Sequence, residues 1–259
     1  MPRILKMVDH TDSFTIKKPG ALWSLPFRLA LVGRTGAGKT SVLGNILLRK
    51  ELYRGNWEGP DIYVFSGSLN TDAKLASILR ELDIPSSNCF ERYSSEILHV
   101  IADEICQNYE QALEQKRKPV HSLIILDDVS YSGALARNAA KDDALHRVAM
   151  NLRKNLCSLI VTAQKYSGLA TAVRENLSGG MIGQSTNKQL DLITSDHCYL
   201  KDKKAFQELF RRQTAEAHDY FVFSLEHPAC YLDHEFRPLP DLLQEKGRLQ
   251  EGGVGEGKA

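Results

Sequence analysis

Residues 27–40 read FRLALVGRTGAGKT, and the part from Gly33 to Thr40 has the spacing G-x-x-x-x-G-K-T. This spacing is typical of a loop that binds the phosphates of a nucleotide. The glycines at positions 33, 36 and 38 allow the backbone N–H groups to turn inward, so oxyanions can approach them without side chains in the way. The apolar run 29–32 predicts a buried strand before the loop, and the apolar spacing behind the loop predicts a helix.

The polar residues of this loop predict how it holds a nucleotide. We expect Lys39 to reach the β- and γ-phosphates and the Thr40 hydroxyl to bind Mg²⁺. The helix that begins here directs the positive end of its dipole at the same phosphates. The plainer alternative is a glycine-rich turn between a strand and a helix. The residues predicted to bind the nucleotide are Gly33, Arg34, Thr35, Gly36, Ala37, Gly38, Lys39, Thr40 and Ser41.

The segment SLIILDD at 122–128 is an apolar run that ends in two carboxylates. A fully apolar central strand delivers such carboxylates to the carboxyl edge of a sheet, beside the phosphate loop. We expect Asp127 to contribute to the shell of Mg²⁺ and Asp128 to orient or deprotonate the water that attacks the γ-phosphate. Many strands end in an aspartate that only caps a turn, but the loop at 33–40 favours the functional interpretation.

A further polar position follows the apolar run 156–163, which predicts another strand. Gln164 stands at the end of this run, where a side chain next to the phosphate strand can sense the γ-phosphate or the attacking water. The alternative is a glutamine that caps the strand. Arg174 follows on a short predicted helix within 169–177.

Composition limits the number of domains and the classes of partner. With 259 residues, 42% hydrophobic and 25% charged, the chain suits one large α/β domain. We expect an arm at 1–26, an ATPase domain at 27–240 and a flexible tail at 241–259. The net charge of +1 confines any DNA contact to a local patch or an oligomeric pore.

Cysteine usage and hydropathy predict the compartment. The five cysteines are scattered and form no C-x-x-C pair, which is typical of a reducing environment and argues against a zinc ribbon. No run of 18 apolar residues is present, and the N-terminus lacks the apolar core of a signal peptide. We therefore expect an intracellular protein without a membrane span.

The remaining apolar patterns predict strands that alternate with helices. Helices are expected at 39–52, 72–82, 94–118 and 201–214, and strands at 62–65, 122–126, 156–163 and 220–223. The buried stripe of the long helix is predicted to be Ile97, Val100, Ile101, Ile105 and Ala112. The segments 181–193 and 198–200 are expected to supply a further strand and a turn. This order predicts an α/β fold, a mainly parallel sheet between two helix layers.

Four segments in this order carry a family resemblance: GRTGAGKT, LIILDD, LRKNLCSLIVTAQ and AVREN. Together they resemble the FtsK/HerA superfamily of DNA-translocating ATPases over about residues 25–235. Within it, the chain is most similar to the genome-packaging ATPases of poxviruses, other large DNA viruses and double-jelly-roll viruses. The resemblance implies a P-loop NTPase fold of the RecA type.

The resemblance also implies catalytic roles. Lys39 holds the phosphates, Asp127 and Asp128 serve metal and water, and Gln164 follows the next strand. Arg153 is implied to act in the site of a neighbouring subunit, with Arg174 as the alternative. Many relatives carry Gly before this arginine and His after it, whereas this chain has Leu152 and Lys154.

The partners and location follow from the same resemblance. It implies ATP and Mg²⁺ as cofactors, a homo-oligomeric ring of five or six subunits, and double-stranded DNA bound without sequence specificity. The loop 131–141 would line the central pore, where Arg137 and Lys141 are candidates for DNA contacts and otherwise are solvated loop charges. Capsid vertex proteins are the implied docking partners. The host cell cytoplasm, a viral factory or the virion is the implied location.

Three other functions fit the same loop. They are a cellular or plasmid-borne translocase of the same superfamily, a small-molecule kinase and a switch protein that only binds its nucleotide. The Asp127–Asp128 pair and Gln164 favour water over a metabolite as the phosphoryl acceptor.

Overall fold

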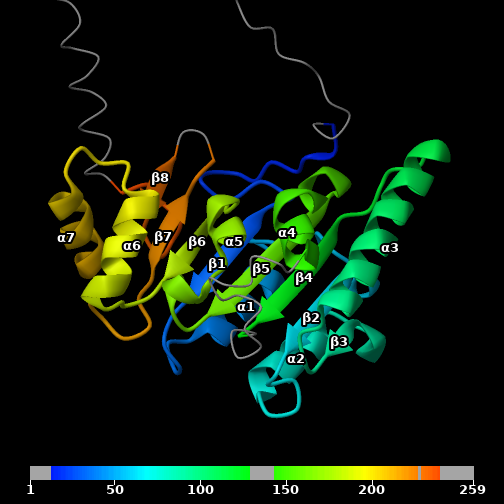
Figure 1. Ribbon diagram of the computed structural model, residues 1–259, viewed down its shortest axis with the longest axis horizontal. Helices are drawn as coiled ribbons and strands as arrows, with labels where there is room; N and C mark the ends of the chain where they lie inside the picture. The colour runs from blue at the N-terminus through cyan, green and yellow to red at the C-terminus, as the bar shows by residue number, and fades with distance from the viewer. Residues whose placement is uncertain (1–12, 129–142, 227–228, 240–259) are drawn as a thin grey trace, which may run out of the picture.

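The protein folds around one sheet, drawn in Figure 1 from the computed structural model. The structure describes residues 13–128, 143–226 and 229–239. The sheet has eight strands in the order β3-β2-β4-β5-β1-β6-β7-β8. The strands from β3 to β6 in this order are parallel, whereas β7 is antiparallel to β6 and β8 is antiparallel to β7. Their bounds are β1 (Arg28–Val32), β2 (Ile62–Ser66), β3 (Cys89–Phe90), β4 (Ser122–Asp127), β5 (Cys157–Ala163), β6 (Gly179–Ile182), β7 (Phe221–Ser224) and β8 (Cys230–Leu232).

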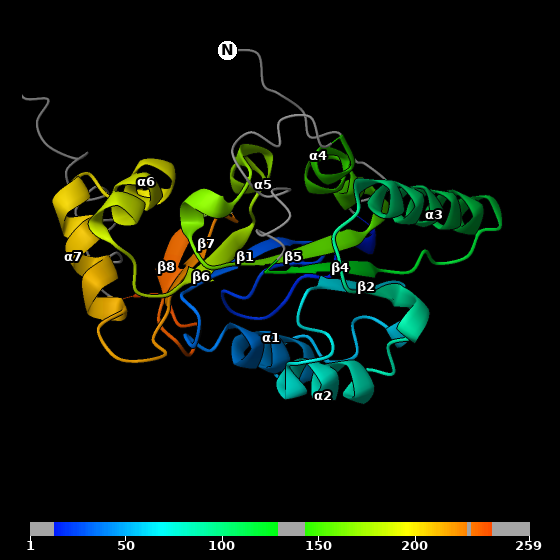
Figure 2. The ribbon, with the colours of Figure 1, turned by 60° about the horizontal axis from the view of Figure 1, so that its bottom comes forward.

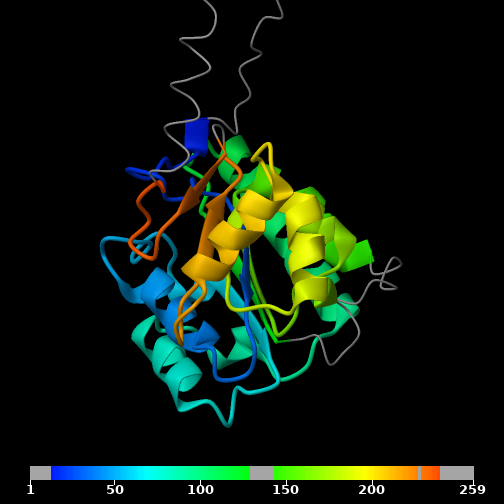
Figure 3. The same ribbon diagram turned by 90° about the vertical axis from the view of Figure 1, so that its left-hand side faces the viewer.

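Helices cover both faces of this sheet. Figure 2 shows α1 and α2 on one face and α3, α4, α5 and α6 on the other, and Figure 3 shows the twisted sheet between these layers. The α-helices are α1 (Lys39–Leu48), α2 (Ala73–Glu81), α3 (Ser95–Glu114), α4 (Asp143–Met150), α5 (Thr171–Glu175), α6 (Asn187–His197) and α7 (Lys203–Gln213). Short 3₁₀ turns are η2 (Gly59–Asp61), η3 (Ser86–Asn88), η5 (Leu152–Asn155) and η6 (Tyr166–Gly168).

The apolar runs of the sequence form the centre of this arrangement. Every residue of β1, β4 and β5 is buried, because helices cover both faces of the parallel strands. Two apolar clusters result, one on each side of the sheet. The predicted α/β class with a mainly parallel sheet is confirmed. No helix in the described ranges has the length and apolar character needed to cross a bilayer.

The segment before β1 packs into the core of the domain. Trp23 is fully buried, and its indole Nε1 donates a hydrogen bond to the Phe223 carbonyl oxygen at 3.2 Å. A Cβ atom at position 179 would lie 2.0 Å from the same Nε1, so only glycine allows β6 to approach this indole. The stretch 13–26 therefore contributes core contacts as well as leading into the first strand.

Two details of the helical layer differ from the sequence predictions. In α3, Ile97 and Val100 are 37% and 66% exposed, whereas Leu98 and Ala102 are buried. The buried stripe therefore differs from the prediction at these positions, whereas Ile101, Ile105 and Ala112 are common to both stripes. The predicted strand within 181–193 ends at Ile182, and the residues from Asn187 onward form α6.

Arg28 connects the start of β1 with the end of α4. Its side chain is buried, and its guanidinium donates to the carbonyl oxygens of Val148 and Ala149 at 2.9 and 3.0 Å, and to that of Cys157 at 2.6 Å. Burial lowers the pKa of Arg28 to about 10, so the group remains a cation at neutral pH. The carbonyls of Val148 and Ala149 belong to the last turn of α4, where a cation is favourable. The arginine thus fixes the end of α4, immediately before η5.

Candidate active site

The loop between β1 and α1 has the backbone geometry that phosphate binding needs. Gly36 and Gly38 have φ angles of 78° and 94°, in the left-handed region that glycine adopts without strain. Gly38 is also the N-cap of α1, so the first turn of this helix begins at the loop. The amide of Gly33 donates to the Ala163 carbonyl oxygen at 3.0 Å, which ties the loop to the end of β5. The N-terminus of α1 and its dipole therefore face the loop, as an anion site requires.

The loop is stabilised by a hydrogen bond across it and by contacts from residues near β7. The Lys39 ammonium donates to the Gly33 carbonyl oxygen at 2.8 Å, across the loop. From the start of β7, the Tyr220 hydroxyl donates to the Ala37 carbonyl oxygen at 2.9 Å, and His218 Nδ1 lies 3.2 Å from the same oxygen. Burial raises the pKa of Tyr220 to about 12, so this phenol stays protonated and remains a donor. Sequence reasoning missed both residues, which are 181 and 183 positions from Ala37.

The α2 helix also contacts the loop helix. The Thr40 hydroxyl donates to Asp72 Oδ2 at 2.9 Å, while Asp72 Oδ1 accepts the backbone N–H groups of Lys74 and Leu75 and so caps α2. The Lys74 ammonium donates to the Ser41 hydroxyl at 2.8 Å. The sequence predicted the helix but gave Asp72 no role, because its partner lies 32 positions away.

The two predicted carboxylates follow one another at the end of β4 but have different surroundings. Asp127 is buried, and its oxygens accept hydrogen bonds from the hydroxyls of Ser66 and Thr162, both at 2.7 Å. Asp128 is half-buried, with a φ angle of 47° and its backbone N–H donating to the Thr162 hydroxyl oxygen at 2.8 Å. The Gln164 amide donates to Asp128 Oδ2 at 2.7 Å. Because β5 lies between β1 and β4, its end brings Gln164 and the carboxylates to one edge of the sheet.

The phosphate loop, Asp72 and the two carboxylates line a cavity of about 750 Å³ at the carboxyl edge of the parallel strands, where ligands bind in open α/β sheets. The Thr40 hydroxyl and the Asp127 carboxylate both face it, and they are the hard oxygen donors that Mg²⁺ prefers. Within the described residues there is no group of three His, Cys, Asp or Glu side chains that holds a metal alone.

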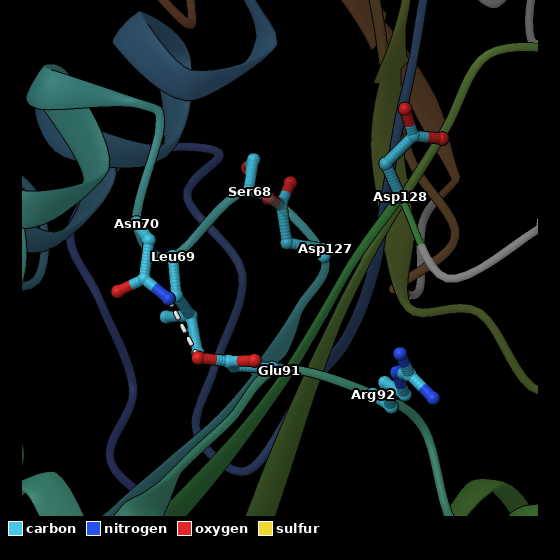
Figure 4. Close-up of a pocket in the computed structure, with 8 residues that line it drawn as sticks. Ser68, Leu69, Asn70, Glu91, Arg92, Asp127 and Asp128 are labelled. Carbon is cyan, nitrogen blue, oxygen red and sulfur yellow. Dashed lines mark hydrogen bonds between the residues drawn. The ribbon is translucent and has the colours of Figure 1, made fainter.

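A second cavity, of about 440 Å³, adjoins the first at Ser68, Asp127 and Asp128. Figure 4 shows it between the loops that follow β2, β3 and β4. Asn70 Nδ2 donates to a Glu91 carboxylate oxygen at 2.6 Å on one side of this cavity, and Arg92 lies on the other side. The two predicted carboxylates therefore lie where the two cavities meet.

The two predicted arginines lie in different surroundings. Arg153 is exposed in η5, which precedes β5 and so lies at the amino edge of the sheet, opposite the nucleotide cavity. Arg174 has a side chain only 8% exposed, paired with Asp196, and its guanidinium lies over the Tyr166 ring, 5.6 Å from its centroid. Arg137, Lys141 and the predicted tail 241–259 lie outside the described residues.

A buried polar cluster follows Gln164 closely in the chain. The Tyr166 hydroxyl donates to an Asp196 carboxylate oxygen at 2.9 Å and lies 2.7 Å from His197 Nε2. His197 Nδ1 is buried without a hydrogen-bond partner among the described residues, and the ring stacks on Phe223 with centroids 4.5 Å apart. Burial lowers the pKa of His197 to about 4, because a proton on Nδ1 would have no acceptor.

We expect this histidine to make the fold sensitive to acid. In the unfolded chain its pKa lies near 6.5, so the unfolded state binds more protons as the pH falls from 6.5 toward 4. The free energy of unfolding should therefore fall by about 2 kcal/mol between pH 7 and pH 5 through this group alone. Burial lowers the pKa of His121 as well, which adds to the same trend. Urea unfolding of the wild type at several pH values measures the slope.

His197→Gln should flatten this slope, because glutamine does not titrate. The matched control is His234→Gln, since His234 is exposed. Equal slopes for the wild type and His197→Gln would contradict the assignment.

Comparisons with known proteins find similar folds and one family model. No curated protein matches the chain in sequence. The genome packaging NTPase B204 from Sulfolobus turreted icosahedral virus 2 has a similar structure. In complex with AMPPCP it gives a TM-score of 0.52 at 12% identity, over 77% of this chain and 92% of B204. In complex with sulfate it gives 0.52 at 13% identity, over 84% of this chain and 100% of B204.

A second ATPase has a similar fold too. EssC (ATPases 2 and 3) from Geobacillus thermodenitrificans gives a TM-score of 0.50 at 16% identity, over 90% of this chain and 46% of EssC. The predicted resemblance to packaging and FtsK-type ATPases is thus confirmed at the level of the fold. The family model described as the NB-ARC domain, which is a P-loop NTPase domain, matches residues 23–209. The chain therefore belongs to the NB-ARC domain family and is a P-loop ATPase.

Proposed function

We propose that the protein is an ATP-driven motor that moves double-stranded viral DNA into a preformed capsid. The observation that carries the proposal is the Asp128–Gln164 pair beside the phosphate loop, a hydrogen-bonded carboxylate and amide at the end of two adjacent strands. Such a pair suits water as the phosphoryl acceptor. The similar fold of B204, whose structure is described as that of a genome packaging NTPase, supports the choice of DNA as the cargo.

In the proposed reaction the chain's own residues position ATP and water. The loop amides and the Lys39 ammonium bind the phosphate oxygens, and Thr40 with Asp127 would hold Mg²⁺. When bound there, Mg²⁺ would neutralise negative charge on the phosphates. Asp128 orients the attacking water and accepts its proton, while the Gln164 amide fixes the direction of that carboxylate. Positioned charge of this kind supplies most of the acceleration in phosphoryl transfer.

The proposed assembly is a closed homo-oligomeric ring of five or six subunits. Head-to-tail contacts that close generate cyclic symmetry. In the proposed ring the amino edge of one subunit meets the nucleotide cavity of the next. Arg153 is proposed to act across that contact. The proposed partners are DNA in the pore and capsid vertex proteins. The host cytoplasm or a viral factory is the proposed location, with attachment to the virion.

We expect double-stranded DNA of any sequence to increase the ATPase rate. The reason is that a motor couples turnover to its cargo, and contacts to phosphates do not depend on the bases. The measurement is phosphate release with no added acceptor, in the presence and absence of DNA, on protein whose oligomeric state is verified. The DNA-dependent part should decrease with salt, because phosphate contacts release counterions.

Three other outcomes would contradict or replace the proposal. A rate that DNA does not change, measured on the intact oligomer, would contradict a motor. ADP formation that needs a metabolite and releases no free phosphate would indicate a kinase, because the phosphoryl group then goes to the metabolite. Nucleotide binding without turnover would indicate a switch.

A further inference from the structure

Asp72 occupies a position between two helices that both face the nucleotide cavity. One carboxylate oxygen, Oδ1, accepts the N–H groups of Lys74 and Leu75 at the start of α2, at 2.8 and 3.2 Å. The other oxygen, Oδ2, accepts the hydroxyl proton of Thr40 at 2.9 Å. A single side chain thus caps one helix and contacts the predicted Mg²⁺ ligand on the next.

A threonine hydroxyl that binds a metal uses an oxygen lone pair, and its proton then needs an acceptor. Asp127 and Asp128 also line the cavity, but Asp127 accepts the hydroxyls of Thr162 and Ser66, and Asp128 Oδ2 accepts the Gln164 amide. Asp72 is the residue that accepts the Thr40 proton. Outer partners of this kind orient a metal ligand and increase its basicity.

We propose that Asp72 is a positioning residue for the metal–nucleotide site. By accepting the Thr40 proton, its Oδ2 directs the lone pairs of the hydroxyl oxygen toward Mg²⁺. The inference rests on the proposed binding of ATP with Mg²⁺ and is independent of DNA as the cargo.

Two further contacts between α1 and α2 surround this hydrogen bond. The Lys74 ammonium donates to the Ser41 hydroxyl at 2.8 Å, so the first turns of α1 and α2 share a second hydrogen bond. Further along, a Cβ atom at Gly44 would lie 3.1 Å from the Ile78 side chain, which shows how closely the two helices pack. The hydrogen bond between Asp72 and Thr40 therefore lies where the two helices are in close contact.

The substitution Asp72→Asn separates the two roles of this side chain. Asparagine is as good an N-cap as aspartate, so its Oδ1 still accepts the N–H groups of α2. Its amide nitrogen, however, is a donor, and it would bind the Thr40 oxygen instead of accepting the Thr40 proton. One of the two lone pairs of the hydroxyl oxygen would then be occupied, and the Thr40 proton would lose its acceptor.

We expect Asp72→Asn to raise the Mg²⁺ concentration needed for nucleotide binding by about tenfold or more. The probe is a fluorescent, non-hydrolysable ATP analogue, titrated into the protein with increasing Mg²⁺ and separately with EDTA. Affinity in EDTA should stay within about twofold of the wild type, since the phosphate loop is unchanged. Turnover is not needed for this readout.

Two control variants accompany the measurement. Asp202→Asn makes the same chemical change at the N-cap of α7, where the aspartate accepts the Lys204 N–H at 2.9 Å. It should leave the Mg²⁺ dependence unchanged. Thr40→Ala removes the ligand itself and should abolish the Mg²⁺ dependence.

The outcomes distinguish this inference from the proposed function. A Mg²⁺ dependence in Asp72→Asn equal to that of the wild type would overturn the positioning role. Equal losses with Mg²⁺ and with EDTA would also overturn it, because they would show a purely structural effect of α2. A wild-type protein that binds the analogue equally well with and without Mg²⁺ would instead contradict the proposed ATPase mechanism.

Discussion

Lys39→Ala should abolish ATP turnover and weaken nucleotide binding together. The ammonium is the charged donor of the phosphate loop, and it contacts the phosphates both in the bound substrate and in the transition state. Loss of one such group lowers turnover by on the order of 10²–10³ or more. Phosphate release and the affinity for a fluorescent ATP analogue measure the two effects. Lys50→Ala is the matched control, because Lys50 is an exposed lysine just beyond the other end of α1.

Asp128→Asn should behave differently, with turnover lost and nucleotide binding kept. The carboxylate of Asp128 is assigned to the attacking water, whereas the metal is assigned to Thr40 and Asp127. Asparagine also tolerates the left-handed backbone at this position, where φ is 47°, so the loop conformation should persist. An equal loss of binding in Lys39→Ala and Asp128→Asn would contradict this division of roles.

The parts of the site that the sequence predicted are of two kinds. They lie on a short motif whose spacing fixes their geometry, such as the loop at 33–40, or at the end of an apolar run, such as Asp127 and Gln164. The order of parallel strands then brings the ends of such runs to one edge. Local pattern and a general rule of topology were therefore sufficient.

The residues that the sequence missed reach the loop through space. The loop and the helix that follows it are contacted by Asp72 at the start of α2, and by His218 and Tyr220 before β7. Motif spacing does not predict these contacts, because the partners are far apart in the chain. The one available signal was an aspartate before an apolar helical pattern, which indicates an N-cap but not its second partner.

The predictions for α3 and for 181–193 were wrong in part because their apolar patterns were ambiguous. In α3, apolar residues occur on more than one face, so the periodicity allowed a stripe through Val100 that is exposed. In 181–193, the short strand β6 is followed closely by α6, and the combined apolar content resembled one strand. Buried Leu190 and Ile193 follow the helical spacing that distinguishes them.

The position of Arg153 predicts that it serves a neighbouring subunit. It lies before β5, whereas Gln164 lies eleven positions later, beyond the end of that strand. A strand of this length spans roughly 20 Å at about 3.3 Å per residue, so the arginine is too far from its own nucleotide cavity. Arg28 fixes the preceding helix end through the carbonyls of Val148 and Ala149, which gives η5 a firm support at the amino edge.

Arg153→Ala should therefore lower turnover by on the order of 10³ while each subunit keeps its affinity for ATP. Mixing is the decisive measurement: Arg153→Ala subunits are combined with Lys39→Ala subunits, each inactive alone. Some interfaces in a mixed ring join an intact phosphate loop to an intact Arg153, so activity should partly return. Arg147→Ala is a control, because Arg147 on α4 is already paired with Asp103.

Inactivity at every mixing ratio, in rings shown to contain both variants, would contradict action in trans. Arg174 would then be the remaining candidate of the sequence, but it would first have to leave Asp196 and the Tyr166 ring. An arginine that enters the site of the next subunit must first leave its partners within its own subunit. An exposed arginine loses no internal partner when it does so. Exposure at the amino edge therefore favours Arg153 over the buried and ion-paired Arg174.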